Sequence, residues 1–406
     1  MNRVMRGKGL WTILAVGVVA VFLLAACAPP TTLPPGGKVV EIGALPVLTG
    51  GGGSADQPAF QGFQDYIRYS NEEERIPGVT VELAWRDSAT DIQRFLSGYE
   101  MLADRGVPVI WSDLTIAYGG LETRLERDRI PLFAGGATAT AVYPPGWIFD
   151  AWATEGESGA VALDYFMKNW GEDRPPRLQL FVSETTFGRE PAAEMTKYAE
   201  STGYEVLPLE ISPLVVIDAT TQLIRIQERG ADLVYIQNIF TAGGPIMRDV
   251  ERLGLEDKMQ FGGTGMVMGG HIIRMAPVGS EGFLAPRGLP WTDETEIPGV
   301  KTMVDIEMKY HGEVYDAPEY QSGWFYAATV CEALKRGIEE VGLENLDGAV
   351  VKRVFENMKD RDIAGMAKVT YGPEDRRGVQ RFAPYQVQGG KIVRVGDFVE
   401  APILVP

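Results

Sequence analysis

Residues 107–138 read VPVIWSDLTIAYGGLETRLERDRIPLFAGGAT. Two short apolar runs, 107–110 and 130–133, enclose a segment whose apolar residues recur at helical spacing. Each run leads directly into small and hydroxylated residues, which are typical of a turn between a strand and a helix. A strand, a helix and a second strand in this order form the unit of a parallel sheet that is covered by helices. The segment therefore predicts an α/β fold.

The same alternation continues along the chain on both sides of this segment. Strand patterns occur at 38–48, 79–85, 177–183 and 231–238, and helical patterns lie between them. The pattern restarts after about residue 155, which produces two successive α/β blocks of similar size. A chain of 406 residues also suggests two domains, at about 150 residues per domain. We therefore expect two lobes, each built on a parallel sheet.

The last third of the chain differs from these blocks. Residues 294–310 and 318–341 have the pattern of longer helices, and the end of the chain is rich in strand patterns. Gly389-Gly390 separates two alternating strands, which predicts a hairpin.

The N-terminus has the pattern of an export signal. Basic residues within the first eight positions precede an apolar run over residues 10–24. An uncleaved membrane helix is the alternative, but it needs about 20 apolar residues and this run is shorter. The string Leu-Ala-Ala-Cys at 24–27 resembles the lipobox of bacterial lipoproteins. The resemblance implies that 1–26 are a signal peptide, that lipid on Cys27 is the membrane anchor, and that the proline-rich residues 27–37 are a linker.

Composition limits the partners and the chemistry. The chain carries a formal net charge of −17, which argues against nucleic-acid binding because phosphate contacts need a basic face. Two histidines and two cysteines are too few for a metal site based on these residue types. The sequence has no nucleophile elbow of the G-x-S-x-G kind. We therefore expect no enzyme activity, no metal and no cofactor, and we expect Cys331 to be a buried free thiol.

Two junctions between strand and helix combine features that suit ligand contact. The segments WSDLTIAYGG at 111–120 and AGGATATAVYP at 134–144 follow the two apolar runs. Small residues let a ligand approach the backbone, and Thr hydroxyls and free N–H groups can bind a carboxylate. Ser and Thr also cap helices, so well-capped helix starts are the alternative. Because both segments share these features, we favour ligand binding.

Several segments have the order and spacing of a known family. They are IGALPVLTG, FQGFQDYI, GVPVIWSDLTIA, IPLFAGGATA, LFVSETTFGRE, ADLVYIQN, FGGTG, YQSGWFYAATVCEAL and VTYGPEDRRG. Through them, residues 39–397 resemble a type I periplasmic binding protein of the leucine/isoleucine/valine-binding branch. The resemblance implies two Rossmann-like lobes joined by three crossovers, with the ligand between them. Together with the restart of the α/β pattern, it places lobe 1 at 38–150 plus 281–380 and lobe 2 at 151–280 plus 381–406.

The resemblance also implies which residues contact the ligand. Thr115, in the first loop, corresponds to the hydroxyl residue that binds the ligand carboxylate. Gly136, Ala137 and Thr138, in the second loop, correspond to the residues that supply backbone groups and a Thr hydroxyl. Phe187 stands where an aromatic residue of the second lobe covers the ligand, although that residue is more often a Tyr.

One position departs from the family. Its amino-acid binders place an acid in the FGGTG region to pair with the ligand's ammonium group, and this chain has Thr264 there. Because a buried ammonium without a partner is costly, either Asp113 or Glu184 replaces that acid or the ligand has no ammonium group. Amides, urea-like solutes and aromatic or aliphatic acids are the alternatives in the second case. Trp111 and Trp152 flank the expected cleft, where each either stacks on the ligand or fills the core.

The resemblance implies a monomeric, extracytoplasmic lipoprotein that delivers a small polar solute to the permease of an ABC importer. The expected ligand is a branched-chain or other hydrophobic amino acid. A sensor of the same fold, which presents its ligand to a signalling partner, is the second hypothesis, and an exported enzyme is the third.

Overall fold

The structure is a computed structural model that describes residues 37–51, 53–315 and 318–404. The elements described below lie in the compact unit Val39–Pro406, except that β1 begins one residue earlier, at Lys38. The predicted signal peptide and the lipid attachment at Cys27 lie outside the described residues. Within the described ranges, no helix has both the length and the apolar character needed to cross a membrane.

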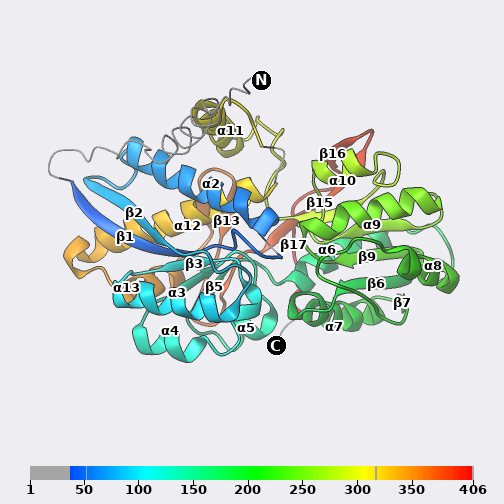
Figure 1. The fold of residues 1–406 in the computed structure, drawn as a ribbon, viewed down its shortest axis with the longest axis horizontal. Helices are drawn as coiled ribbons and strands as arrows, with labels where there is room; N and C mark the ends of the chain where they lie inside the picture. The colour runs from blue at the N-terminus through cyan, green and yellow to red at the C-terminus, as the bar shows by residue number, and fades with distance from the viewer. Residues whose placement is uncertain (1–36, 52, 316–317, 405–406) are drawn as a thin grey trace, which may run out of the picture. The chain divides into compact units, whose positions relative to one another are not determined.

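The first sheet has six strands in the order β14-β5-β4-β3-β1-β2 (Figure 1). They are β1 (Lys38–Leu45), β2 (Val79–Trp85), β3 (Ile110–Ser112), β4 (Leu132–Ala134), β5 (Ile148–Trp152) and β14 (Arg377–Val379). The pairs β1–β3, β3–β4, β4–β5 and β5–β14 are parallel. One face is covered by α2 (Gly53–Glu72), α12 (Pro318–Val341) and α13 (Gly348–Glu356), and the other by α3 (Ile92–Asp104), α4 (Glu122–Asp128) and α5 (Ala139–Val142).

Side-chain alternation in the short central strands explains this double cover. Ile110 and Leu132 are paired in register and pack in the core beneath α3, α4 and α5. The next pair, Trp111 and Phe133, points to the opposite face and packs in the core beneath α2, α12 and α13. Trp111 is 1% exposed, and its ring stacks on that of Phe63 with centroids 4.5 Å apart. Trp111 therefore fills the core.

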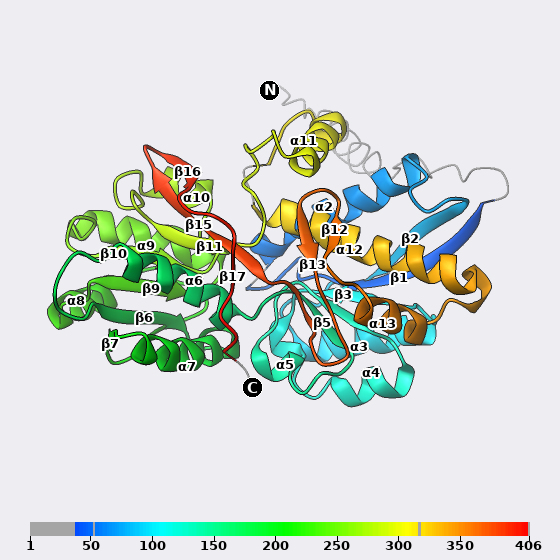
Figure 2. The ribbon, with the colours of Figure 1, turned by 180° about the vertical axis from the view of Figure 1, so that it is seen from behind.

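The second sheet has nine strands, seven of them in the order β16-β15-β11-β10-β9-β6-β7 (Figure 2). They are β6 (Arg177–Ser183), β7 (Glu205–Val206), β8 (Glu210–Ser212), β9 (Leu233–Gln237), β10 (Gln260–Gly263), β11 (Leu284–Arg287), β15 (Arg381–Gln388), β16 (Lys391–Arg394) and β17 (Val399–Glu400). One face packs on α6 (Glu155–Lys168) and α7 (Thr186–Ser201), and the other on α8 (Thr220–Arg229), α9 (Phe240–Leu253) and α10 (Gly270–Met275).

The predicted fold class, an α/β protein with two lobes built on parallel sheets, is confirmed. The predicted hairpin at Gly389-Gly390 joins β15 to β16, which pair antiparallel. Cys331 is a buried free thiol, as expected.

The chain passes between the two sheets at more than one place. It leaves the first sheet after β5 and returns to it after β11, where α11 (Pro298–His311) leads to α12. It leaves again after β14, which only Gln380 separates from β15. Strand β11 lies in the part of the chain that the sequence placed in lobe 1, but it pairs with β10 and β15 of the second sheet. Strand β11 has only four residues, which is too short for a hydrophobic period to indicate the sheet that the strand joins.

Candidate ligand-binding cavity

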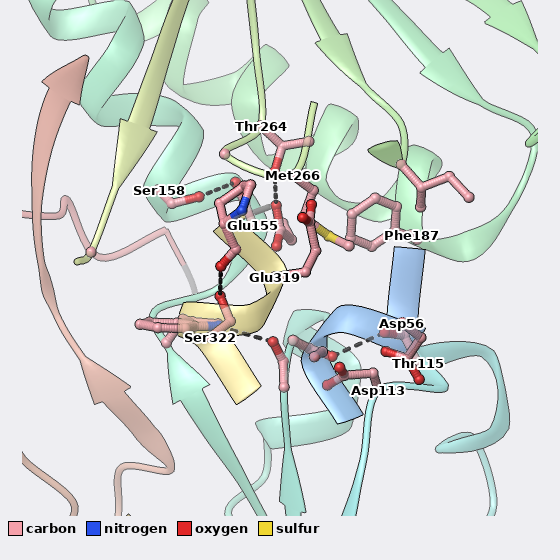
Figure 3. A pocket seen from close by; sticks show the side chains of 18 of the residues that line it. Asp56, Asp113, Thr115, Glu155, Ser158, Phe187, Thr264, Met266, Glu319 and Ser322 are labelled. Atoms are coloured by element: carbon pink, nitrogen blue, oxygen red, sulfur yellow. Dashed lines mark hydrogen bonds between the residues drawn. The ribbon is translucent and has the colours of Figure 1, made fainter. Parts of the chain in front are cut away.

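A cavity of about 220 Å³ lies at the carboxyl ends of strands from both sheets, where ligands of open parallel sheets bind (Figure 3). The ends of the strands and the loops that follow them contribute Asp113–Ile116, Gly135–Gly136, Trp152–Ala153, Thr264–Met266 and Gly288–Leu289. Helices contribute Asp56 and Ala59 of α2, Glu155 and Ser158 of α6, Phe187 of α7, and Glu319, Ser322 and Tyr326 of α12. The cavity has room for a small solute.

The structure brings most of the predicted ligand contacts together. The cavity is lined by Asp113, Thr115, Gly136, Trp152, Phe187 and Thr264. The lining does not include Ala137 or Thr138, which are both buried in the turn that precedes α5. Glu184 is exposed at the surface and is also absent from the lining.

A pair of carboxyl groups lies on the side of the cavity that belongs to the first lobe. Asp56, near the start of α2, accepts a hydrogen bond from the backbone N–H of Val47 at 2.5 Å. Its carboxyl group is also hydrogen-bonded to that of Asp113, which follows β3 (Figure 3). Two carboxylates have no proton to share, so one member of the pair is protonated. Burial is the main cause that raises the pKa of both groups, and the charge of Asp56 raises that of Asp113 further.

A third carboxyl group is buried behind this side of the cavity. Asp150, in β5, is 0% exposed and accepts hydrogen bonds from the backbone N–H groups of Ala137 at 2.8 Å and Trp152 at 3.3 Å. Burial raises its pKa well above the usual value, although these hydrogen bonds oppose the shift. The charge of Asp150 in turn raises the pKa of Asp113. The first lobe therefore places three carboxyl groups close together at this side of the cavity, and burial opposes the ionisation of each of them.

The two predicted loops are bonded to each other. The Thr115 hydroxyl donates to the backbone carbonyl of Gly136 at 2.9 Å, which ties the loop after β3 to the loop after β4. Thr138 is the N-cap residue of α5, and its hydroxyl lies 3.2 Å from that of Thr140. Both hydroxyls therefore have partners within the protein.

An acid stands next to Thr264 although the sequence has none at that position. Glu155 opens α6, and its Oε2 accepts from the Thr264 hydroxyl at 2.8 Å and from Gln237 Nε2 at 3.3 Å. Burial raises the pKa of Glu155, and the two hydrogen bonds oppose that shift. Glu155 and Thr264 lie on the opposite side of the cavity from the Asp56–Asp113 pair (Figure 3).

Among the described residues that line the cavity, Arg287 is the only base. It ends β11, is 8% exposed, and donates through Nη2 to Gln321 Oε1 at 3.0 Å. Its guanidinium lies over the Trp291 ring, 4.6 Å from the centroid. Arg287 Nε has no hydrogen-bond partner within the described part of the chain. The buried Glu319, on α12, interacts electrostatically with this guanidinium.

The rest of the wall is largely aromatic and aliphatic. Trp152 donates through Nε1 to the carbonyl of Gly135 at 2.9 Å, and the Tyr326 hydroxyl donates to the same carbonyl at 2.7 Å. The Trp152 ring stacks on Phe325 with centroids 5.4 Å apart, so its orientation is fixed. Phe187 contributes a further ring from the second lobe (Figure 3). An apolar ligand body can pack against this wall.

Comparison with known proteins shows the family to which this chain belongs. A family model described as "Periplasmic binding protein" matches residues 39–391. The chain belongs to the periplasmic binding protein family. No curated protein sequence matches it.

Solved structures of this architecture cover nearly the whole chain. A branched-chain amino acid ABC transporter protein from Thermus thermophilus with bound valine is 24% identical, with a TM-score of 0.84 over 91% of this chain and 98% of that one. A fatty acid ABC transporter substrate-binding protein from Thermomonospora curvata is 17% identical, with a TM-score of 0.77 over 91% and 95%. A solute-binding protein from Rhodopseudomonas palustris BisB5, in complex with 3,4-dihydroxybenzoic acid, is 19% identical, with a TM-score of 0.76 over 90% and 98%. These likenesses show the fold.

The sequence did not point to several lining residues of this periplasmic binding protein, among them Asp56, Glu155, Arg287 and Glu319. A capping box at the start of α6, formed by Thr154 and Glu157, marks where that helix begins and so locates Glu155 in its first turn. The others carry no comparable local signal, because their place in the cavity depends on how the two lobes are assembled.

Proposed function

We propose that this periplasmic binding protein is an extracytoplasmic, lipid-anchored receptor that binds a small solute in the cavity and delivers it to the permease of an ABC importer. The likeness to structures described as ABC transporter proteins supports the importer role. The lipobox-like string that ends in Cys27 supports the anchor. The proposed activity is binding and release without chemical conversion of the solute.

The proposed ligand is a branched-chain or other hydrophobic amino acid, which combines an apolar body with an ammonium group. The charge balance of the lining is the observation that supports this choice. Four carboxyl groups, those of Asp56, Asp113, Glu155 and Glu319, line the cavity together with the single guanidinium of Arg287. An ammonium group can donate hydrogen bonds to these acids and its charge favours their ionised form, whereas a solute whose only charge is negative has a single base with which to pair.

Amides and urea-like solutes are the second class of ligand. They donate hydrogen bonds to carboxyl groups and bring no negative charge to the cavity. Fatty acids and benzoic acids, which bind to other proteins of this architecture, fit the acidic lining less well. In each case we propose contacts from Asp113, Thr115, Gly136, Trp152, Phe187 and Thr264.

A thermal-shift screen of the mature protein tests the proposal. The panel contains aliphatic and aromatic amino acids, amides, urea derivatives, amines, fatty acids and benzoic acids. A ligand present at 100 times its dissociation constant stabilises the folded state by about 2.7 kcal/mol, which is readily measured as a rise in melting temperature. We expect the largest shifts from hydrophobic amino acids. A panel without any shift would contradict the solute-binding role, and a shift confined to acids would contradict the proposed ligand class.

A further inference from the structure

We propose that the Asp56–Asp113 carboxyl pair is the subsite for a cationic nitrogen of the ligand, and that a ligand carboxylate binds at Arg287 on the second lobe. This orientation is the reverse of the one that the sequence implied, in which Thr115 and the loop after β4 bind a carboxylate. The inference rests on the proposed function, because it requires the cavity to be the ligand site.

The geometry of the pair favours a cation at this position. Asp56 and Asp113 both line the cavity, where their carboxyl groups lie together with a proton between them (Figure 3). A ligand ammonium group can hydrogen-bond to both carboxylates at once and take the place of that proton. It also offsets the charge of Asp150, which lies beneath the pair without access to solvent.

The same region is less suited to an anion, because two of its donors are engaged. The Thr115 hydroxyl donates to the carbonyl of Gly136 at 2.9 Å, and the N–H of Ala137 donates to Asp150 at 2.8 Å. A carboxylate placed here would compete for these donors and would also face the Asp56–Asp113 pair. Both effects lower the affinity for an anion at this side of the cavity.

Arg287 is a second, independent sign of a polar ligand in this cavity. Its side chain is nine-tenths buried and lines the cavity, and its Nε has no partner in the described part of the chain. A buried donor that lacks a partner is costly, and a planar guanidinium binds a carboxylate with two parallel hydrogen bonds. Contact with Gln321 and Trp291 holds the group in place before a ligand arrives.

The test compares ligands that carry only one of the two charged groups. Isothermal titration calorimetry on the mature protein would use leucine, 3-methylbutylamine and 4-methylpentanoate, which share one side chain, and phenylalanine, phenethylamine and 3-phenylpropanoate. We expect the amino acid and the amine of at least one series to bind, and the carboxylate to bind at least tenfold more weakly than the amine. Asp113→Asn should weaken amine binding at least tenfold, and Arg287→Gln should weaken amino-acid binding but not amine binding.

The matched control is Glu184→Gln, which removes an exposed carboxylate outside the cavity and should leave every affinity unchanged. Asp56→Asn provides a second test of the pair if Asp113→Asn does not fold. A carboxylate that binds more tightly than its amine, or unchanged amine affinity in a folded variant of the pair, would overturn the inference and leave the solute-binding role intact. Binding of only uncharged or anionic solutes in the thermal-shift panel would also overturn the inference without contradicting the solute-binding role. If no solute binds at all, the proposed function fails together with the inference.

Discussion

At the scale of single residues, the cavity keeps acids in an environment that opposes their ionisation. Asp113 contacts Asp56, and the charge of Asp150 acts on it as well. Tyr118 and Tyr326 also face this group, and the charge of Asp113 contributes to raising the pKa of both phenols, after burial as the main cause. Such a cluster destabilises the folded protein at neutral pH, and a protein tolerates that cost where the groups serve a ligand.

Asp113→Asn should therefore stabilise the ligand-free protein at neutral pH. Burial raises the pKa of Asp113 in the folded state well above its usual value of 3.8, so the folded state holds a proton that the unfolded chain releases. Stability is consequently lost as the pH rises from about 4 toward the raised pKa, and this loss is absent at lower pH. Urea denaturation between pH 4 and pH 8 measures it: the free energy of unfolding of the wild type should fall relative to that of the variant. A difference that does not change with pH would contradict the assignment.

At the scale of elements, the close packing of α2 on α12 positions one wall of the cavity. Both helices carry lining residues, with Asp56 and Ala59 on α2 and Glu319 and Tyr326 on α12. Glycine allows the two backbones to approach: a Cβ at Gly323 would lie 1.7 Å from the carbonyl oxygen of Ala59. No real side chain fits in that space, so the contact depends on glycine.

Gly323→Ala should destabilise the protein by about 1–3 kcal/mol, which is typical of overpacking in a well-packed core. Gly119→Ala is the control, since a Cβ at Gly119 meets no atom within 4 Å and its backbone angle φ is not positive. Thermal or urea denaturation of the two variants measures the difference. Equal stabilities would mean that α2 and α12 can move apart with little loss of folding free energy. Their close spacing would then not determine the position of the cavity wall.

Local patterns predicted the elements better than they predicted the site. The helix expected at 318–341 is α12 with the same bounds, because its apolar period is long. The helical segment expected between the apolar runs 107–110 and 130–133 is instead a short 3₁₀ turn, Thr115–Ala117, followed by α4. Gly119 and Gly120 interrupt the helix, and Gly120 has a positive φ of 79°.

The site is harder to predict because its residues are distant in sequence. Asp113 and Thr115 follow a strand, so their place at the sheet edge could be inferred from their position alone. Asp56 and Glu155 reach the same cavity from two other helices, and Thr264 meets Glu155 only because β10 ends beside the start of α6. No pattern in one segment carries that information.

At the scale of the whole molecule, we predict that the attachment to the membrane depends on the N-terminal cysteine. Cys27→Ser should block lipidation and release the protein from the membrane, because the lipobox-like string at 24–27 makes Cys27 the proposed site of the anchor. Membrane fractionation of cells that express either form measures this, and the melting temperature of the released variant checks that it still folds. Membrane association of the variant as tight as that of the wild type would contradict a lipid anchor.

The two lobes should also close toward each other when a ligand binds, because the cavity takes its lining from both of them. The connections are short enough to act as hinges, and one of them consists of Gln380 alone. Thr140, in α5, donates to Glu190 of α7 at 2.8 Å, so contact between the lobes is available outside the cavity. Small-angle scattering should show a smaller radius of gyration with saturating ligand. Glu190→Ala removes an acceptor on the second lobe without touching the lining, so it should speed ligand dissociation while the discrimination between amine and carboxylate probes stays unchanged. An unchanged radius under saturating ligand would mean that the cavity is already formed, and that affinity depends on its lining alone.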